Sequence, residues 1–171
     1  MSLLQPQTAK NTDVAELIRV QAERLRLLDL KALNKAGSGH PGGTLSLADV
    51  IATLFFGNVF RYDPAEPSWI NRDRLVLSEG HSAPILYSAF TEAGYQGWSE
   101  QALMDLRKDP DAIAQGHTTR GLTPGVDCST GALGMGLSKA LGMALAARYK
   151  GQDFHTFCIV GDGEAQEGQT Y

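Results

Sequence analysis

An acidic turn, Gly161-Asp162-Gly163, directly follows an apolar run that ends at Val160. A run of this kind predicts a strand, and ligands bind at the carboxyl ends of strands in open α/β sheets. A carboxylate fixed there between two glycines suits a metal ion held against a phosphate, because glycine lets backbone N–H groups approach closely. Asp162 is therefore a candidate metal ligand, although Gly-Asp-Gly also forms many ordinary turns.

Three of the four histidines, His40, His81 and His117, directly follow a glycine in a predicted loop. An imidazole in such a loop can hydrogen-bond a phosphate or transfer a proton near neutral pH. One alternative is three unrelated loop histidines, since polar residues are common in loops. A second alternative is a three-histidine zinc site, but zinc ligands usually include a closely spaced pair, which this sequence lacks.

A run of small residues, Gly131-Ala132-Leu133-Gly134, begins a predicted helix that extends to Tyr149. A helix N-terminus with free N–H groups and no obstructing side chains binds phosphate. The spacing matches neither the dinucleotide-binding nor the P-loop pattern, so close helix packing explains the run equally well. The stripe expected along this helix consists of Leu137, Leu141 and Leu145.

Several helices must position these residues. The first predicted helix begins at Asn11 or Thr12 and ends at Gly37. Its predicted buried stripe consists of Val14, Leu17, Ile18, Leu25, Leu28 and Ala32. The glycine-rich stretch over 37–43 is expected to be a loop, and the next helix is expected near Ser46, with Asp49 in a capping-box position. Its buried face is predicted to consist of Val50, Ile51, Leu54 and Phe55.

Two strands are predicted, over 74–78 and 154–160, and helices separate them along the chain. Two helices are expected between Pro84 and Gly94 and between Ser99 and Asp109, followed by a long loop over 111–130. Buried strands alternating with helices indicate an α/β fold, a parallel sheet with helices on both faces. Since two strands are too few for such a sheet, we expect an incomplete domain over 12–171, preceded by a flexible arm over 1–11.

The bulk composition excludes several classes of function. The 171 residues carry a net charge of -4 without a basic stripe, which argues against nucleic-acid binding. No apolar run approaches the roughly 20 residues of a membrane span, so no membrane partner is expected. Cys128 and Cys158 are isolated, which favours reduced thiols and a cytoplasmic location over a disulfide framework.

Four segments together resemble the transketolase family, in particular the separately encoded N-terminal subunit of split transketolases. They are SGHPGGTLSLADV (38–50), NRDRLVLSEGHSAPILYSAF (71–90), TPGVDCSTGALGMGLSKALGMALAARY (123–149) and IVGDGEAQEG (159–168). They occur in the family's order and cover about three quarters of the chain. The resemblance implies the thiamine-diphosphate-binding fold, of which this chain would be the N-terminal part.

The resemblance also implies an enzyme that transfers a two-carbon ketol unit between sugar phosphates, with thiamine diphosphate and Mg²⁺ or Ca²⁺ as cofactors. Asp162 matches the metal ligand, and Gly163 matches the residue whose N–H meets the diphosphate. His40, His81 and His117 match active-site histidines, and His81 also lies beside the cofactor diphosphate in the family. Further matches to the cofactor-binding segment and to a buried interface glutamate are Gly131, Ala132, Leu133 and Glu167. Thr118 replaces the family's usual proline after the third histidine.

The partners implied by the resemblance are sugar phosphate substrates and a C-terminal transketolase subunit, in a homodimer or an α2β2 assembly. The family's second metal ligand and its cofactor-activating glutamate have no counterpart before Tyr171, so we expect the isolated chain to lack transketolase activity. Two alternatives are a non-catalytic binding module and a related thiamine-diphosphate enzyme that acts on another sugar acceptor.

Overall fold

The computed structural model describes residues 11–171, with the backbone alone for residues 11 and 12. The elements along the chain are α1 (Asn11–Ala36), α2 (Pro41–Ser46), α3 (Ala48–Phe56), β1 (Arg74–Leu77), η1 (Gly80–Ser82), α4 (Ala83–Glu92), α5 (Glu100–Met104), α6 (Met135–Lys150), β2 (Thr156–Ile159), η2 (Glu164–Gln166) and η3 (Gly168–Thr170). The predicted arm over 1–11 lies outside the described residues, apart from Asn11, where α1 begins. No described helix has the length and apolarity needed to cross a membrane.

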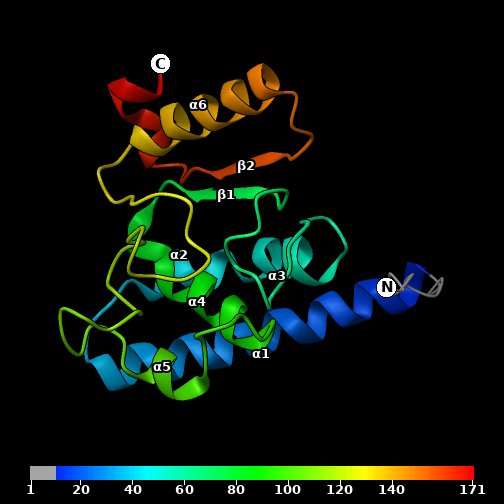
Figure 1. The fold of residues 1–171 in the computed structure, drawn as a ribbon. Helices are drawn as coiled ribbons and strands as arrows, with labels where there is room; N and C mark the ends of the chain where they lie inside the picture. Colours follow the sequence, from blue (N-terminus) through cyan, green and yellow to red (C-terminus); the bar gives the residue numbers. More distant parts are fainter. Residues whose placement is uncertain (1–10) are drawn as a thin grey trace.

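The sheet consists, in the described residues, of β1 and β2, which pair in parallel. The register runs from Arg74 opposite Thr156 to Leu77 opposite Ile159. Helix α6 covers one face, while α2, α4 and α1 lie on the other (Figure 1). This arrangement confirms the predicted α/β architecture with helices on both faces of a parallel sheet.

The two strands differ in burial. Residues 75–77 of β1 are buried, as a strand covered on both faces requires, whereas every residue of β2 is only partly buried. The sequence predicted a buried apolar run in β2, and that prediction is wrong for the described chain. Each strand has a partner strand along one side only, but the loop over 111–130 also covers β1: its Asp127 carboxylate accepts the Leu75 N–H, and its Thr130 hydroxyl donates to the Leu77 carbonyl.

Helix α1 is buried mainly along its second half. Ala22, Leu25 and Ala32 are fully buried, whereas Leu17, predicted on the same stripe, is 46% exposed. The first turns of α1 extend past α3 and α4, which cover the rest of the helix (Figure 1). The sequence also missed Asp29, a fully buried carboxyl on the covered face.

The glycine-rich stretch after His40 is helical, and the predicted loop is wrong from Pro41 onward. The fixed φ of proline suits the first helical position, so α2 begins there. The Thr44 hydroxyl of α2 donates to Asp29 Oδ2 at 2.6 Å, which fastens this short helix to α1. Leu47 separates α2 from α3.

The prediction of the buried face of α3 is confirmed in part. Ile51, Leu54 and Phe55 are buried as predicted, but Val50 is 47% exposed. The carboxylate of Asp49 pairs with Arg26 of α1 rather than capping a helix. The predicted capping box is therefore wrong, because the carboxylate has a cationic partner across the helix pair.

Helix α5 ends earlier than predicted. The predicted N-cap is confirmed, since the Ala102 N–H donates to Ser99 Oγ at 3.1 Å. The helix stops at Met104 instead of Asp109, because Arg107 adopts a left-handed backbone with φ of 58°. Its N–H donates to the Ala114 carbonyl at 2.9 Å, outside any helix.

The predicted loop over 111–130 is confirmed and is fastened to β1 by Asp127. This carboxylate accepts the Leu75 N–H at 2.9 Å and forms a two-point ion pair with Arg72, at 2.8 and 3.0 Å. Both charged side chains are more than nine-tenths buried. A carboxylate therefore holds the loop against the strand that leads into the histidine region.

Helix α6 begins at Met135, so the prediction that Gly131 starts it is wrong. Gly134 precedes the helix in a left-handed conformation that glycine adopts without strain. The buried residues of α6 are Gly136, Ala140 and Ala147. The predicted stripe is exposed instead, and the fractions are 39% for Leu137, 59% for Leu141 and 57% for Leu145.

Close packing of α6 on the strands explains which face is buried. A Cβ atom at Gly136 would lie 2.3 Å from Ser78 Oγ and 2.6 Å from Ser78 Cα, so only glycine fits there. The small-residue face therefore approaches the sheet, and the leucine face points away from it. The helical period of the sequence distinguishes the leucine face of α6 from its small-residue face. It does not indicate which of the two packs against the sheet.

Candidate active site

The first two histidines lie side by side. His81 belongs to η1, directly after β1, and His40 immediately precedes α2. Their ring centroids are 5.0 Å apart, with the planes inclined at 59°. His81 Nε2 lies 3.4 Å from Glu79 Oε2, so a carboxylate borders the pair.

The third histidine, His117, is linked to the other two by contacts at Gly131 and Gly80. A Cβ atom at Gly131 would lie 2.6 Å from His117 Cδ2, which means that the imidazole lies directly against this glycine. A Cβ atom at Gly80 would lie 2.7 Å from the Thr130 carbonyl carbon, so the β1 end and the Gly131 loop also touch. The His117 carbonyl accepts the Tyr87 hydroxyl at 3.0 Å.

The pKa of His117 is lowered, first by partial burial of the imidazole. Arg107, His81 and His40 lower the pKa of His117 further, because a positive charge on any of them opposes protonation. The neutral imidazole is thus favoured near neutral pH. A neutral ring keeps both a donor and an acceptor, which suits it to hydroxyl recognition and proton transfer.

The acidic turn lies at the same edge of the sheet. Because β1 and β2 are parallel and in register, Glu79 and Asp162 both follow strand carboxyl ends. A Cβ atom at Gly161 would lie 3.0 Å from Glu79 Oε2, so the turn lies against this carboxylate. Glu79 therefore connects the acidic turn with His81.

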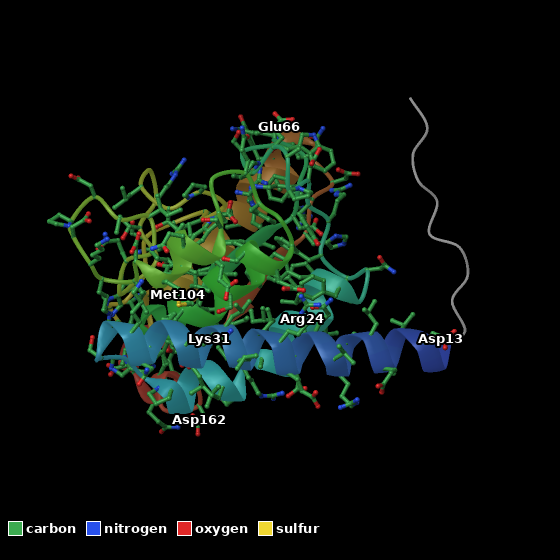
Figure 2. All side chains as sticks on the ribbon, turned by 90° about the horizontal axis from the view of Figure 1, so that it is seen from below. Asp13, Arg24, Lys31, Glu66, Met104 and Asp162 are labelled. Atoms are coloured by element: carbon green, nitrogen blue, oxygen red, sulfur yellow. The ribbon has the colours of Figure 1, made fainter. Side chains whose placement is uncertain are left out.

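Asp162 and Gly163 are exposed. Figure 2 places Asp162 at the margin of the molecule, on the side opposite Glu66. The φ of Gly163 is −64°, and a Cβ atom there would meet no atom of the chain within 4 Å. The chain's own conformation does not require glycine at this position, whereas close approach of an external group would.

Glu164 is a buried carboxylate of this region that the sequence analysis missed. It is 4% exposed, and its Oε1 accepts the Ser78 hydroxyl at 2.5 Å and the Gly134 N–H at 2.8 Å. Its Oε2 accepts the Gly161 N–H at 3.2 Å. One carboxylate thus joins the ends of both strands to the start of α6.

This contact changes the interpretation of the helix N-terminus. The sequence offered Gly131–Gly134 as a phosphate seat, but the Gly134 N–H donates to Glu164 and the Gly136 N–H donates to Ser78 Oγ at 3.1 Å. These two amides have internal acceptors and are therefore not free to bind a phosphate. The acidic turn is followed by the short 3₁₀ turns η2 and η3.

Glu79 is the second residue that the sequence analysis missed. Burial raises the pKa of Glu79; His81 opposes this rise, while Glu164 and Asp162 reinforce it. Three carboxylates therefore gather where the two strands end. The only sequence signal was that acidic residues follow both predicted strands.

The remaining candidates lie around this cluster. Gly131 contacts His117, whereas Ala132 and Leu133 are exposed in the turn before α6. Glu167 is exposed, although the resemblance implies a glutamate that is buried between subunits; within this one chain only its Cβ packs, 3.0 Å from a Cβ position at Gly134.

The donor set fits a divalent cation only in part. Among the described residues, no three His, Cys, Asp or Glu side chains are arranged to hold a metal ion. Asp162 supplies one exposed carboxylate beside the unobstructed backbone of Gly163. Such a set suits a cation whose other ligands are phosphate oxygens or come from elsewhere.

A surface hollow of about 660 Å³ lies away from the histidines. It is lined by Arg72, Asp127 and Pro124, among others, and by none of the three cluster histidines. Its buried charges are already paired with each other. The chemistry-bearing residues therefore identify a different region as the candidate site.

Comparison with known proteins finds matches over most of the chain. A family model described as transketolase, thiamine diphosphate binding domain, matches residues 18–171. A 6-deoxy-6-sulfo-D-fructose transketolase subunit of Clostridium sp. (strain MSTE9) is 42% identical over 151 residues, covering 88% of this chain and 54% of that protein. A transketolase of Treponema pallidum is 40% identical, covering 90% of this chain and 24% of that one.

Among solved structures, the transketolase of Campylobacter jejuni superposes with a TM-score of 0.84 at 37% identity. The superposition covers 91% of this chain and 25% of that one. The chain thus spans about half the length of the clostridial subunit and about a quarter of the full-length enzymes.

Proposed function

Because this chain belongs to the transketolase family through its thiamine-diphosphate-binding domain, we propose that it forms the diphosphate side of a transketolase active site. The proposed reaction is transfer of a two-carbon ketol group between sugar phosphates, with thiamine diphosphate and Mg²⁺ or Ca²⁺ as cofactors. The observation that carries this proposal is the meeting of the acidic turn and the histidines at one sheet edge, with Glu79 in contact with both.

Asp162 would hold the cation through its exposed carboxylate, and the Gly163 N–H would face the diphosphate. The open space around Gly163 supports this role, because a group from outside the chain can approach its backbone. The carboxylate prefers hard cations such as Mg²⁺ and Ca²⁺. Gly131, Ala132 and Leu133 would flank the cofactor from the α6 side.

The histidines would manage protons and hydroxyl groups of the sugar. Thiamine diphosphate, when bound, supplies the carbanion chemistry of ketol transfer. His40 and His81, 5.0 Å apart, would contact substrate and diphosphate respectively, and His117 would bind donor hydroxyls. The lowered pKa of His117 supports this role, since a neutral imidazole can accept a proton at neutral pH.

We further propose that activity requires a C-terminal transketolase subunit, in a homodimeric or α2β2 assembly, with Glu167 at the interface. The similarity to a protein named as a transketolase subunit supports this partner. That relative's name also supports a second candidate substrate, a sulfonated sugar, in place of a sugar phosphate. A cytoplasmic location stays a prediction based on Cys128 and Cys158.

Isothermal titration of the chain with thiamine diphosphate in Mg²⁺ tests the cofactor site directly. We expect micromolar binding that is lost in Asp162→Ala and weakened about tenfold or more in Gly163→Ala, where a methyl group would meet the diphosphate. Asp13→Ala is the matched control, because Asp13 is an exposed aspartate at the far end of α1 (Figure 2).

The same titration separates the proposed function from a non-catalytic module. Absence of heat at millimolar cofactor, with the chain folded by circular dichroism, would refute cofactor binding by this chain. A coupled ketol-transfer assay with and without the C-terminal subunit then tests the reaction. Comparison of phosphorylated and sulfonated donors in that assay decides between the two substrate classes.

A further inference from the structure

Arg107 has a backbone conformation that its residue type disfavours. Among the described residues, two non-glycine residues have positive φ, Asn58 and Arg107, both at 58°. Asparagine adopts this conformation readily, because its short polar side chain can hydrogen-bond locally, whereas arginine is strained in it. Strain of this kind persists where surrounding contacts enforce it.

The contacts of the Arg107 side chain reach two histidine loops. Its Nη1 donates to Ser38 Oγ at 3.0 Å, two residues before His40. A Cβ atom at Gly116 would lie 2.7 Å from Arg107 Nε and 3.3 Å from Cζ, so the guanidinium packs on the backbone directly before His117. The planar guanidinium thus lies between the segments that carry His40 and His117.

The charge of Arg107 is directed at the same cluster. Among the described side chains, its hydrogen-bond partner is the neutral Ser38 hydroxyl rather than a carboxylate. The charged or titratable groups that face His117 are Arg107, His81 and His40, and all of them oppose its protonation. Arg107 is the one of these groups whose charge is permanent at physiological pH.

From these contacts we propose that Arg107 is a positioning residue of the histidine cluster, which holds the Ser38–His40 and Gly116–His117 segments together. It acts through the histidines and is not itself assigned contact with substrate. Its meaning for ketol transfer rests on the proposed function, but its effect on the two loops can be measured without any cofactor.

Three variants separate the contributions of side chain, charge and hydrogen bond. Arg107→Gly removes the guanidinium while allowing the left-handed backbone. Arg107→Lys keeps the charge but loses the planar fork, and Ser38→Ala removes only the hydrogen-bond partner. Asn58→Gly is the matched control, because it relieves the other positive φ and alters no histidine contact.

NMR titration of the His117 imidazole and amide hydrogen exchange are the two readouts. In Arg107→Gly we expect the pKa of His117 to rise, because one nearby cation that opposes its protonation is removed. Amides of both segments, residues 38–40 and 116–117, should exchange about tenfold faster. Arg107→Lys should speed exchange while leaving the pKa of His117 close to that of the native chain, and Ser38→Ala should speed exchange in the first segment alone.

An unchanged pKa of His117 together with unchanged exchange in Arg107→Gly would overturn the proposal. Exchange that rises equally throughout the chain would also overturn it, since that result indicates a general loss of stability. If Arg107→Gly does not fold, the Arg107→Lys and Ser38→Ala exchange patterns decide the question. None of these measurements includes thiamine diphosphate, so failure of cofactor binding would leave this inference standing, and the reverse also holds.

Discussion

Replacement of Asp29 by asparagine tests the buried carboxyl that fastens α2, and with it His40, to α1. Asp29 is fully buried, its Oδ2 accepts the Thr44 hydroxyl at 2.6 Å, and its Oδ1 has no partner among the described residues. Burial raises the pKa of Asp29 from 3.8 to about 6, and the Thr44 hydrogen bond opposes this rise. The folded chain therefore keeps a proton that the unfolded chain has already released.

The direction of the pH dependence follows from linkage. A carboxyl whose pKa is raised by folding contributes its full stability below the unfolded value, and this stability is lost as pH rises through the folded value. The rise from 3.8 to about 6 corresponds to about 3 kcal/mol of unfolding free energy. About 1.4 kcal/mol of this falls between pH 5 and pH 8. Asp29→Asn stays neutral, so its stability relative to the native chain should increase over that interval by this amount.

Urea unfolding followed by circular dichroism at several values between pH 5 and pH 8 measures this difference. The contributions of all other groups cancel in the comparison, since both proteins carry them. Asp13→Asn, an exposed aspartate on the same helix, should show no such growth with pH. A constant difference between Asp29→Asn and the native chain across this range would refute a raised pKa at Asp29.

Two further substitutions test the packing around the site by the same unfolding measurement. Gly80→Ala should lower the free energy of unfolding by about 2 kcal/mol, because its Cβ would lie 2.7 Å from the Thr130 backbone; Gly168→Ala, which meets open space, is its control, and equal effects would contradict the reasoning. Asp127→Ala should lower it by about 3–5 kcal/mol, because Arg72 would stay buried without its partner. A loss below 1 kcal/mol would mean that solvent reaches this pair.

The meeting of His81 and the acidic turn at one sheet edge was predictable from the sequence. Short apolar runs end directly before Glu79 and before Asp162, and parallel strands in register place their carboxyl ends at the same edge. Two of the glycines that precede a histidine also lie in close contacts: a Cβ atom at Gly80 would lie 2.7 Å from the Thr130 carbonyl carbon, and one at Gly116 would lie 2.7 Å from Arg107 Nε. Local sequence patterns were therefore sufficient to predict the part of the site that lies at the strand ends.

The contacts of the buried Glu164 carboxylate with Ser78, Gly134 and Gly161 were not predictable from local sequence patterns. Glu164 and Ser78 are 86 residues apart in sequence, and nothing near either residue marks it as buried. Acidic residues after a turn usually face water, so the local sequence gives no reason to expect Glu164 to be buried. Only the packing of α6 against both strands brings the Gly134 amide, the Ser78 hydroxyl and this carboxylate together.

The burial of α6 shows a further limit of periodicity. Both of its faces have a helical period, one of leucines and one of Gly and Ala. Apolar area favours burial of the leucines, but the short distance to Ser78 admits only a glycine at position 136. The decisive quantity is a distance between backbones, which the sequence of one helix does not encode.

The charges at the sheet edge connect the fold with the proposed cofactor. Glu79, Glu164 and Asp162 gather at the strand ends, and Glu79 is raised in pKa by burial and by the two other carboxylates. Glu164 therefore accepts the Gly134 and Gly161 N–H groups despite electrostatic repulsion from the two neighbouring carboxylates. A divalent cation at Asp162 would oppose that repulsion, so its binding should also stabilise the fold. Asp162 is exposed and can therefore take a ligand. Glu164 is buried and holds the strand ends that position Asp162.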